Sequence, residues 1–360
     1  MAQIRSFAGL DVHAAKVIAA TVDGGSGELR FRRLSGATSE VAAFCAELPT
    51  PTRVAYEAGP TGFGLARELE RAGIACVVAA PGKIARAPQD RVKTDRRDAE
   101  RLVRLLMAGE LHPVRVPSVT EEALRDLVRA REDLRGDLMR ARHRVGKLLL
   151  RHDVRFEGNN WTQAHRRWLA GLELGEPVAQ AVLEDGLGAI DALLVRREAL
   201  ERQMTGLVPA SPWATEIARL RCLRGIDTLT ALGLCAEVGD FGRFRRPGQL
   251  MSYLGLVPSE NTSGEKRRQG SITKSGSQHA RRLLVEAAWH NRRAPRIGRE
   301  LARRQDGQPH HVRAIAWQAQ RRLHRTWQRL DHDRGKRRTV VAVAVARELA
   351  GFCWAVTTAD

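Results

Sequence analysis

The sequence has few acidic residues for its many basic ones and no paired cysteines, and both shortages exclude classes of protein. It contains 60 Lys and Arg against 41 Asp and Glu, which gives a formal charge of +19 at pH 7 and an isoelectric point near 11.0. Its five cysteines are scattered without a Cys-x-x-Cys pair, so we expect neither a zinc ribbon nor a disulfide framework. A reducing cytoplasm fits this cysteine usage.

Long apolar runs are also missing from the chain. The most apolar stretch, residues 339–357, is interrupted by Arg347 and Glu348, which suits a packed terminal helix better than a membrane span. Residues 1–5 lead directly into a strand-like run, so we expect no signal peptide. The sequence therefore predicts a cytoplasmic protein without a membrane partner.

The chain does have length and positive charge. Its 360 residues with 43% hydrophobic content are enough for two or three domains with buried cores. The charge favours a polyanionic partner and a strong dependence of binding on salt. Nucleic acid is the first expectation. An acidic membrane surface fits less well, because the basic residues are spread along the chain and no amphipathic anchor stands out.

The first 115 residues have the pattern of an α/β domain. Three strand-like segments separated by turns precede a helix, and further strands then alternate with helices, which indicates a mixed sheet with an antiparallel start. The expected strands are residues 6–12, 16–22, 29–33, 53–57 and 75–80, and the expected helices are residues 39–48 with Ser39 as cap, a helix from the turn at 59–62 to about 72, and one that contains Asp98 and ends near 108.

Four acidic residues of this domain are candidates for a metal site. Asp95 and Asp98 are three residues apart, so both lie on one face at the start of a helix. Helix capping is the simpler interpretation, with Thr94 or Asp95 as cap and Asp98 in the first turn. Asp11 and Glu57, however, end or follow buried strands, where an uncompensated carboxylate is costly. Strand-end acids that converge with a helix-borne pair are the arrangement by which an RNase H-like fold holds metal ions for phosphodiester cleavage.

Residues 118–208 have the pattern of long charged helices. Beyond Pro117, apolar residues follow heptad spacing on a charged background over residues 124–148, with Arg131 breaking one position. A second run at residues 190–207 repeats the spacing. We interpret the pair as an antiparallel helical hairpin or an oligomerising coiled coil, and the alternative is a solvated linker helix packed on its own domain.

Residues 212–360 are expected to form a mainly α-helical domain. Residues 223–232 are typical of the hairpin in a helix-hairpin-helix, whose backbone amides bind phosphate without reading sequence. Asp227 occupies the position where such a hairpin usually has its second glycine. The alternative is an ordinary turn between two helices. A hydroxyl-rich basic loop at residues 259–276 precedes a basic helix at residues 278–292. A serine in such a loop is either a phosphate-facing nucleophile or part of a phosphate cradle.

These motifs together resemble the insertion sequence 110 family of transposases over nearly the whole chain. The segments similar to its DEDD signature are residues 9–11 (Gly-Leu-Asp), 56–60 (Tyr-Glu-Ala-Gly-Pro) and 93–99 (Lys-Thr-Asp-Arg-Arg-Asp-Ala). The segments similar to its C-terminal transposase domain are residues 223–240, 254–258 (Leu-Gly-Leu-Val-Pro) and 262–264 (Thr-Ser-Gly).

The resemblance implies three domains and a metal site. It predicts a RuvC-like, RNase H-like catalytic domain at residues 1–115, a coiled-coil linker at residues 118–208 and a transposase domain at residues 212–360. The Mg²⁺ ligands that it implies are Asp11, Glu57, Asp95 and Asp98.

The resemblance also implies a nucleophile and partners. Ser263 matches the catalytic serine, with Ser271, Ser275 and Ser277 as close competitors. The family works as dimers that pair into tetramers, in which the acids of one protomer complete the serine site of another. A structured non-coding bridge RNA pairs with donor and target DNA, which would explain why so basic a chain has no recognisable helix-turn-helix or zinc finger.

A set of mostly basic residues is expected to contact nucleic acid. Its members are Lys93, Arg96, Arg97, Gly225, Thr228, Lys266, Arg267, Arg268, Lys274, Arg281 and Arg282. We therefore expect a nucleoid-associated bacterial or archaeal transposase. Two alternatives are a RuvC-like nuclease that uses metal-activated water, and a non-catalytic RNA- or DNA-binding architectural protein whose acids are structural.

Overall fold

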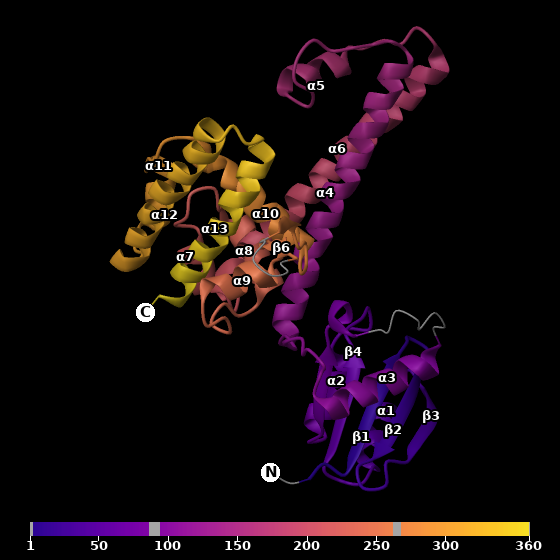
Figure 1. Ribbon diagram of the computed structural model, residues 1–360. Helices are drawn as coiled ribbons and strands as arrows, with labels where there is room; N and C mark the ends of the chain where they lie inside the picture. Colours follow the sequence, from indigo (N-terminus) through magenta and orange to yellow (C-terminus); the bar gives the residue numbers. More distant parts are fainter. Residues whose placement is uncertain (1–2, 86–93, 262–267, 360) are drawn as a thin grey trace. The chain divides into compact units, whose positions relative to one another are not determined.

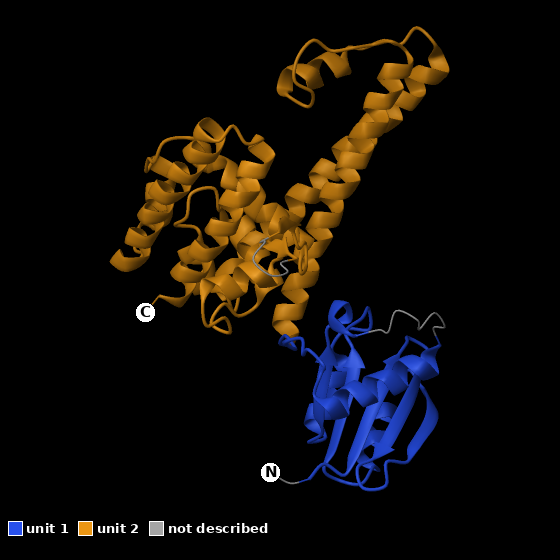
Figure 2. Ribbon diagram, in the orientation of Figure 1, with its two compact units in different colours: residues 1–118 blue, residues 119–360 orange. Residues whose placement is uncertain are grey.

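The computed structural model describes residues 3–85, 94–261 and 268–359. Four predicted site residues, Lys93, Ser263, Lys266 and Arg267, lie outside these ranges, so the assignments made for them stay predictions. The chain forms two compact units, residues 1–118 and residues 119–360 (Figure 2). The separation of residues 118–208 from residues 212–360 as a domain of its own also stays a prediction.

The first unit is built on a five-stranded mixed sheet with the strand order β3-β2-β1-β4-β5. Its strands are β1 (Ser6–Val12), β2 (Lys16–Asp23), β3 (Leu29–Ser35), β4 (Thr52–Glu57) and β5 (Ala75–Ala79). The first three strands pair antiparallel, whereas β4 runs parallel to β1 and β5 runs parallel to β4. The predicted antiparallel start of a mixed sheet is thus confirmed.

Helices cover both faces of this sheet (Figure 1). On one face, α1 (Thr38–Ala46) and α2 (Gly64–Arg71) share a core with Leu10 of β1 and Tyr56 of β4. On the other face, α3 (Asp95–Ala108) packs against β1 and β2. A short 3-10 turn, η1 (Pro81–Lys83), follows β5. Ser39 is not the cap of α1, because the helix already begins at Thr38 after Ala37.

The second unit begins with a long helical hairpin. Helices α4 (Val119–Arg151) and α6 (Pro177–Leu207) pack together, with α5 (Gln163–Ala170) between them in the chain (Figure 1). Of the interpretations of the two heptad runs, the structure thus contains the intramolecular hairpin. Arg131, which breaks the apolar pattern, pairs with Glu201 of α6 at 2.6 Å. The basic residue that interrupts the heptad pattern therefore forms an ion pair between the two helices of the hairpin.

The rest of the second unit is mostly helical. In chain order its elements are η2 (Val208–Ala210), α7 (Ala214–Leu220), α8 (Thr228–Val238), α9 (Pro247–Tyr253), β6 (Pro258–Glu260), β7 (Gln269–Ile272), α10 (Gln278–Ala288), η3 (Trp289–Arg292), α11 (Arg299–Gln305), α12 (His310–Gln328), the π-helical turn η4 (Arg329–Asp333) and α13 (Arg338–Thr358). Strands β6 and β7 pair antiparallel. Residues 259–276, which we expected to form a loop, thus contribute to a small two-stranded sheet.

Helix α13 is the centre of this unit's core. Among the described residues it is the one helix long and apolar enough, by length and composition, to cross a membrane. Its side chains Val345, Leu349 and Cys353 are buried, and it packs against α7, α9, α10 and α12. The expectation of a packed terminal helix is confirmed, because neighbouring helices take up its apolar surface.

Candidate metal and nucleic-acid sites

Two of the four predicted acids lie at the same edge of the sheet. Leu10 of β1 is paired with Tyr56 of the parallel strand β4, and both side chains point into the core beneath α1 and α2. Asp11 and Glu57 are the next residues of these strands. Because side chains alternate across a strand, both belong to the opposite face, which α3 covers.

A helix start brings the other two acids to this face. Helix α3 begins at Asp95, and the Thr94 hydroxyl caps it by accepting a hydrogen bond from the backbone N–H of Arg97 at 3.3 Å. Capping by Thr94 is therefore confirmed. Gly9 lets this helix lie directly on β1, since a Cβ there would stand 2.3 Å from the carbonyl oxygen of Ala99.

Asp11, His13 and Asp95 form a compact cluster. Their potential ligand atoms all lie within 4.8 Å of one another. The Nε2 atom of His13 is 3.1 Å from Oδ2 of Asp11 and 3.7 Å from Oδ1 of Asp95. Lys16 also reaches Asp95, with Nζ 2.5 Å from Oδ2. His13 and Lys16 were not predicted from the sequence as part of this site. His13 stands only two residues beyond the strand-end Asp11, so a motif extended past residue 11 would have included it.

The charges of this cluster are incompletely balanced. Burial raises the pKa of the Asp11 carboxyl, and the nearby Asp95 and Asp98 carboxylates raise it further, against the opposing effect of His13. The hydrogen bond from Lys16 lowers the pKa of Asp95. Asp98 is buried in the first turn of α3, where Arg101 donates to it at 2.8 Å. A divalent cation fits this donor set, because Mg²⁺ prefers carboxylate oxygens and would offset the mutual repulsion.

Glu57 is a predicted metal ligand that lies outside the compact cluster. Its side chain is exposed at the end of β4, and it is not a member of the compact group formed by Asp11, His13 and Asp95. The register of β1 and β4 brings it to the correct sheet edge, so its role as a metal ligand stays a prediction.

Arg281, a predicted phosphate contact, has partners inside the chain. Its Nη1 atom donates to the carbonyl oxygens of Leu254 and Gly276, both at 3.2 Å, and to that of Ser275. Gly276 has a φ of +68°, and a Cβ there would stand 2.1 Å from the carbonyl oxygen of Tyr253. Arg281 and Gly276 thus fix the chain that follows β7 against the end of α9.

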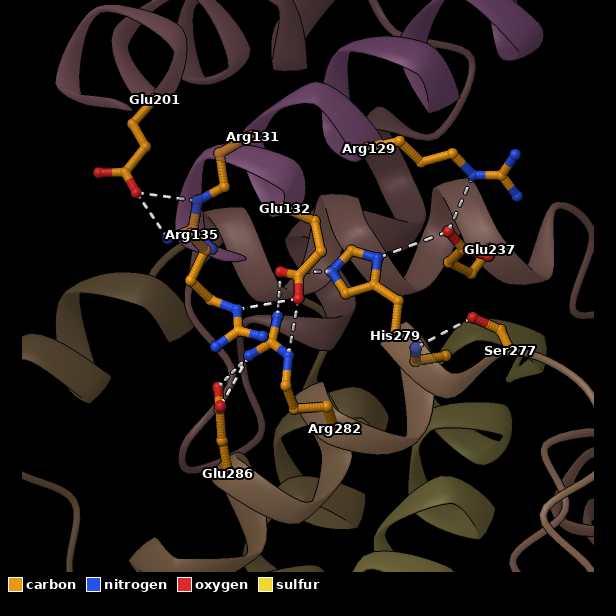
Figure 3. Close-up of polar contacts among 11 residues, drawn as sticks. Arg129, Arg131, Glu132, Arg135, Glu201, Glu237, Ser277, His279, Arg282 and Glu286 are labelled. Carbon is orange, nitrogen blue, oxygen red and sulfur yellow. Dashed lines mark hydrogen bonds and ion pairs between the residues drawn. The ribbon is translucent and has the colours of Figure 1, made fainter. Parts of the chain in front are cut away.

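Arg282 belongs to a polar network between α4 and α10 (Figure 3). Its guanidinium binds Glu132 of α4, at 2.5 and 3.1 Å, and Glu286 at 2.7 Å. His279 lies between two acids, 3.6 Å from Glu132 and 3.4 Å from Glu237. This histidine and its partners were not foreseen. The role of Arg282 in nucleic-acid binding stays a prediction, but its observed partners make it part of the joint between the hairpin and the core.

Glu237 is the most strongly stabilised carboxylate in this network. Despite a desolvation effect that acts in the opposite direction, hydrogen bonds and nearby charges from His279, Arg129 and Ser277 lower its pKa to about 2. Ser277 also caps α10 by accepting a hydrogen bond from the N–H of Ala280 at 3.1 Å. Ser277 thus has a structural role at the start of α10, and its candidacy as nucleophile stays a prediction.

The predicted contacts in the first unit and near β7 are spread out. Arg96 stacks over the ring of Phe31, with its guanidinium carbon 3.9 Å from the ring centroid. Arg97 contributes its backbone N–H to the cap of α3. Arg268 and Lys274 are exposed on either side of β7. No described contact joins these residues into one patch.

The turn between α7 and α8 lies beside an arginine-rich hollow of about 760 Å³. Gly225 has a φ of +87°, and a Cβ there would stand 2.4 Å from the carbonyl oxygen of Ala287. Asp227, the departure from the expected glycine, caps α8 by accepting from the N–H of Thr230 at 2.8 Å. The arginines that line the hollow beside Gly225 and Thr228 are Arg221, Arg224, Arg296, Arg299, Arg303 and Arg304. Most come from sequence far from the turn, so local patterns could not group them.

Comparison with known proteins supplies the identity that geometry alone does not. A family model described as "Transposase IS116/IS110/IS902 family" matches residues 217–303, and a model of DEDD transposases of the IS110 type, described as "Transposase", matches residues 8–152. A protein of Sinorhizobium fredii named "Putative transposase y4qE" is 42% identical over 98% of this chain and 88% of its own length. The "Transposase for insertion sequence element IS1533" of Leptospira borgpetersenii is 31% identical over 92% of this chain and 98% of its own. The chain belongs to the IS116/IS110/IS902 family of transposases.

Proposed function

We propose that this transposase cuts and rejoins the DNA strands at the ends of its mobile element, with Ser263 as nucleophile and a Mg²⁺ site formed by Asp11, Glu57, Asp95 and Asp98. The observation that supports the proposal best is the meeting of Asp11 and Asp95, which come from a strand end and a helix start 84 residues apart and have ligand atoms within 4.8 Å of each other. When bound, the metal would stabilise negative charge on the scissile phosphate and on the oxygen that leaves it.

The residues of the chain have separate roles in this scheme. The Ser263 hydroxyl loses its proton and its oxygen attacks phosphorus, so that a serine–phosphate bond forms while the bond from phosphorus to a deoxyribose oxygen breaks. That deoxyribose oxygen takes up a proton and leaves as a hydroxyl. A hydroxyl of another strand reverses the step and restores the free serine, so rejoining needs no external energy source.

The proposed assembly follows the family resemblance. The first unit is taken as an RNase H-like, RuvC-like catalytic domain, and the meeting of the strand-end Asp11 with the helix-borne Asp95 supports this assignment. The protein works as dimers that pair into tetramers, with acids from one protomer beside the serine of another. A bridge RNA supplies sequence specificity by base pairing with donor and target DNA, while the charge of +19 serves to grip backbones.

Excision by purified variants tests the two halves of the proposal separately. Asp11→Ala, Asp98→Ala and Ser263→Ala should each lower excision by at least about 100-fold, since each removes several kcal/mol of stabilisation or the nucleophile itself. DNA and RNA binding should remain. A denaturing gel should show a covalent protein–DNA adduct with the wild type and none with Ser263→Ala, whereas Ser271→Ala and Ser275→Ala should keep the adduct.

Mixing two inactive variants tests the shared site. If one protomer's acids serve another's serine, Asp11→Ala and Ser263→Ala chains combined should recover part of the excision that each lacks. Cleavage without any adduct would favour the nuclease that uses metal-activated water. Normal excision by Ser263→Ala would refute the serine nucleophile, and folded protein that never cleaves would support an architectural role.

A further inference from the structure

A basic, aromatic hollow lies at the far end of the α4–α6 hairpin from the helical core. It has a volume of about 520 Å³, which is within the range of sites for small organic groups. Its walls come from the last turns of α4, the segment that follows α4, and α5. The residues that line it are Arg142, His143, Gly146, Lys147, Leu149, Leu150, Val154, Arg155, Phe156, Asn160, Trp161, His165 and Trp168.

Four rings form one wall of this hollow. His165 lies at the centre of the group, with its ring centroid 4.9 Å from that of Phe156, 5.2 Å from that of Trp161 and 5.5 Å from that of Trp168. His165 itself is buried, while both tryptophans are only partly covered. The two indoles therefore keep surface that faces the hollow.

Trp161 is held in an unusual backbone conformation. Its φ is +63°, a left-handed value that bulky residues rarely adopt. The backbone N–H of Trp161 donates to Nδ1 of His165 at 3.0 Å, which fixes the turn. Strain of this kind concentrates at ligand-binding sites, and here it determines where the indole of Trp161 stands.

The charged side chains that line this hollow are basic, although one of them, Arg155, also pairs with Asp153 at 3.2 Å. Arg142, His143, Lys147 and Arg155 line the hollow, and no carboxylate does among the described residues. The guanidinium carbon of Arg142 is 5.0 Å from the centroid of the Trp161 ring, and its buried Nε has no hydrogen-bond partner in the described part of the chain. An anion would give this arginine a partner that the fold does not supply.

The positive surface continues beyond the hollow. A second depression, of about 490 Å³, shares His143 and Lys147 with the first and is also lined by Arg144 and Arg151, with Asp185 as its one acidic residue among those described. Residues 144, 147 and 151 follow helical spacing and so share one exposed side of α4. A chain of phosphates could therefore run from one depression to the other along this helix.

From this geometry we infer that the hollow binds an unpaired nucleotide of a single-stranded nucleic acid, with the base against Trp161 and Trp168 and the adjoining phosphates on Arg142 and Lys147. Accessible aromatic faces combined with cations are the means by which proteins hold single strands. A duplex keeps its bases stacked inside and offers none to the rings. An acidic peptide would match the charge but would leave the indole faces without a flat partner.

Binding by the full-length protein tests this inference, with labelled 12-nucleotide oligo(U), oligo(dT) and a 12-base-pair duplex as probes. Trp168→Leu should weaken binding of the single strands by about 5- to 150-fold, the range expected for one stacked base, and should leave duplex binding unchanged. Lys147→Gln should weaken single-strand binding and reduce its salt slope by about 0.7. Ultraviolet cross-linking of oligo(U) should label peptides that contain Trp161 or Trp168.

Matched controls separate the site from the general positive charge. Trp317→Leu removes an exposed indole from α12, and Arg202→Gln removes an exposed cation from α6 outside the hollow; neither should change single-strand binding. Trp168→Phe keeps a ring and should retain most of the affinity even if Trp168→Leu unfolds the tip. A larger loss for oligo(U) than for oligo(dT) would identify RNA as the occupant, and equal losses would identify a single strand of either sugar.

Equal affinity of Trp168→Leu and wild type, an equal loss on duplex, or cross-links only outside the tip would overturn the inference. None of these results depends on excision. A failed serine mechanism and a failed tip site are therefore distinguishable.

Discussion

The acids of the two units have opposite surroundings, although the chain as a whole is strongly basic. In the first unit, Asp11 and Asp95 share His13 at a partly open sheet edge, Lys16 pairs with Asp95 alone, and the pKa of Asp11 is raised. In the second unit, Glu237 has a side chain only 8% exposed and lies among His279, Arg129 and Ser277, which lower its pKa to about 2.

This difference distinguishes a candidate ligand-binding site from a charge network that holds helices together. Where burial and neighbouring carboxylates raise a carboxyl pKa, the folded chain leaves negative charge that an external cation can offset. Where arginine and histidine surround a carboxylate, its charge is already balanced and holds elements together. The network of Figure 3 accordingly links α4, α8 and α10, whereas the cluster at Asp11 has capacity left for a ligand.

Removing the charge of Glu237 should give the largest change in stability. Its folded pKa near 2 lies below the ordinary 4.5, so the carboxylate stabilises the fold above about pH 4.5, and that stabilisation is lost as the pH falls from 4.5 towards 2. Glu237→Gln should lower the free energy of unfolding at pH 7 by about 2 to 3 kcal/mol. Urea unfolding of the wild type and Glu237→Gln at pH 7 and at pH 3 measures the free energy of unfolding at each pH.

The exposed Glu198, which pairs with Arg202 on α6, offers a matched control. Glu198→Gln should change stability by less than about 0.5 kcal/mol. If Glu237→Gln had an equally small effect, the network would not be the joint that we describe.

A methyl group at Gly9 should give an intermediate change and should affect the metal site indirectly. The Cβ of Gly9→Ala would stand 2.3 Å from the carbonyl oxygen of Ala99 and 2.5 Å from the backbone N of Val103, so α3 must shift away from β1. We expect a loss of about 1 to 3 kcal/mol in stability and weaker Mg²⁺-dependent excision, because Asp95 and Asp98 move with the helix.

Gly64→Ala provides the comparison, since a Cβ there meets nothing within 4 Å. Thermal unfolding and excision should both remain close to wild type in this variant. Identical behaviour of the two glycine variants would contradict the close approach of α3 to β1 as the feature that positions the acids.

Asp11→Asn should have the smallest effect on stability, and in the opposite direction to Glu237→Gln. The raised pKa of Asp11 means that the folded state favours the protonated carboxyl, so this contribution is fully present below the ordinary pKa and is lost as the pH rises through the folded pKa. Without Mg²⁺ at pH 7, Asp11→Asn should therefore raise stability, by less than Glu237→Gln lowers it.

Added Mg²⁺ should stabilise the wild type more than Asp11→Asn, since binding to the folded state alone shifts unfolding. Melting temperatures measured with and without Mg²⁺ provide the check. A marked loss of stability in Asp11→Asn without metal would show that this carboxylate is a structural group like Glu237.

Local patterns were enough to predict the elements of the first unit. The strands near Leu10 and Tyr56 are short apolar runs between turns, and the cap at Thr94 is a local motif, so neighbouring residues carry the information. The same reasoning failed for Ser39, because α1 begins one residue earlier, after Ala37, whose side chain makes no capping hydrogen bond.

Contacts between distant residues could not be predicted in this way. His13 joins Asp95 only because β1 and α3 pack together, and His279 joins Glu237 and Glu132 only because α4, α8 and α10 meet. Arg281 and Arg282 have the composition of phosphate contacts, yet carbonyl groups and carboxylates of the chain itself bind them. Composition predicts charge, but it does not predict which charges are already paired.

The sequence by itself determined the family and the order of the elements in the first unit, and it predicted Asp11, Glu57, Asp95 and Asp98 as metal ligands, because each inference depends on residue type and spacing along the chain. The tertiary structure alone decided which acids meet, which arginines are occupied within the fold, and that Arg142, Trp161 and Trp168 face one hollow at the hairpin's tip. Burial and charge balance depend on packing between segments far apart in sequence, and it is packing that separates a binding site from a structural joint.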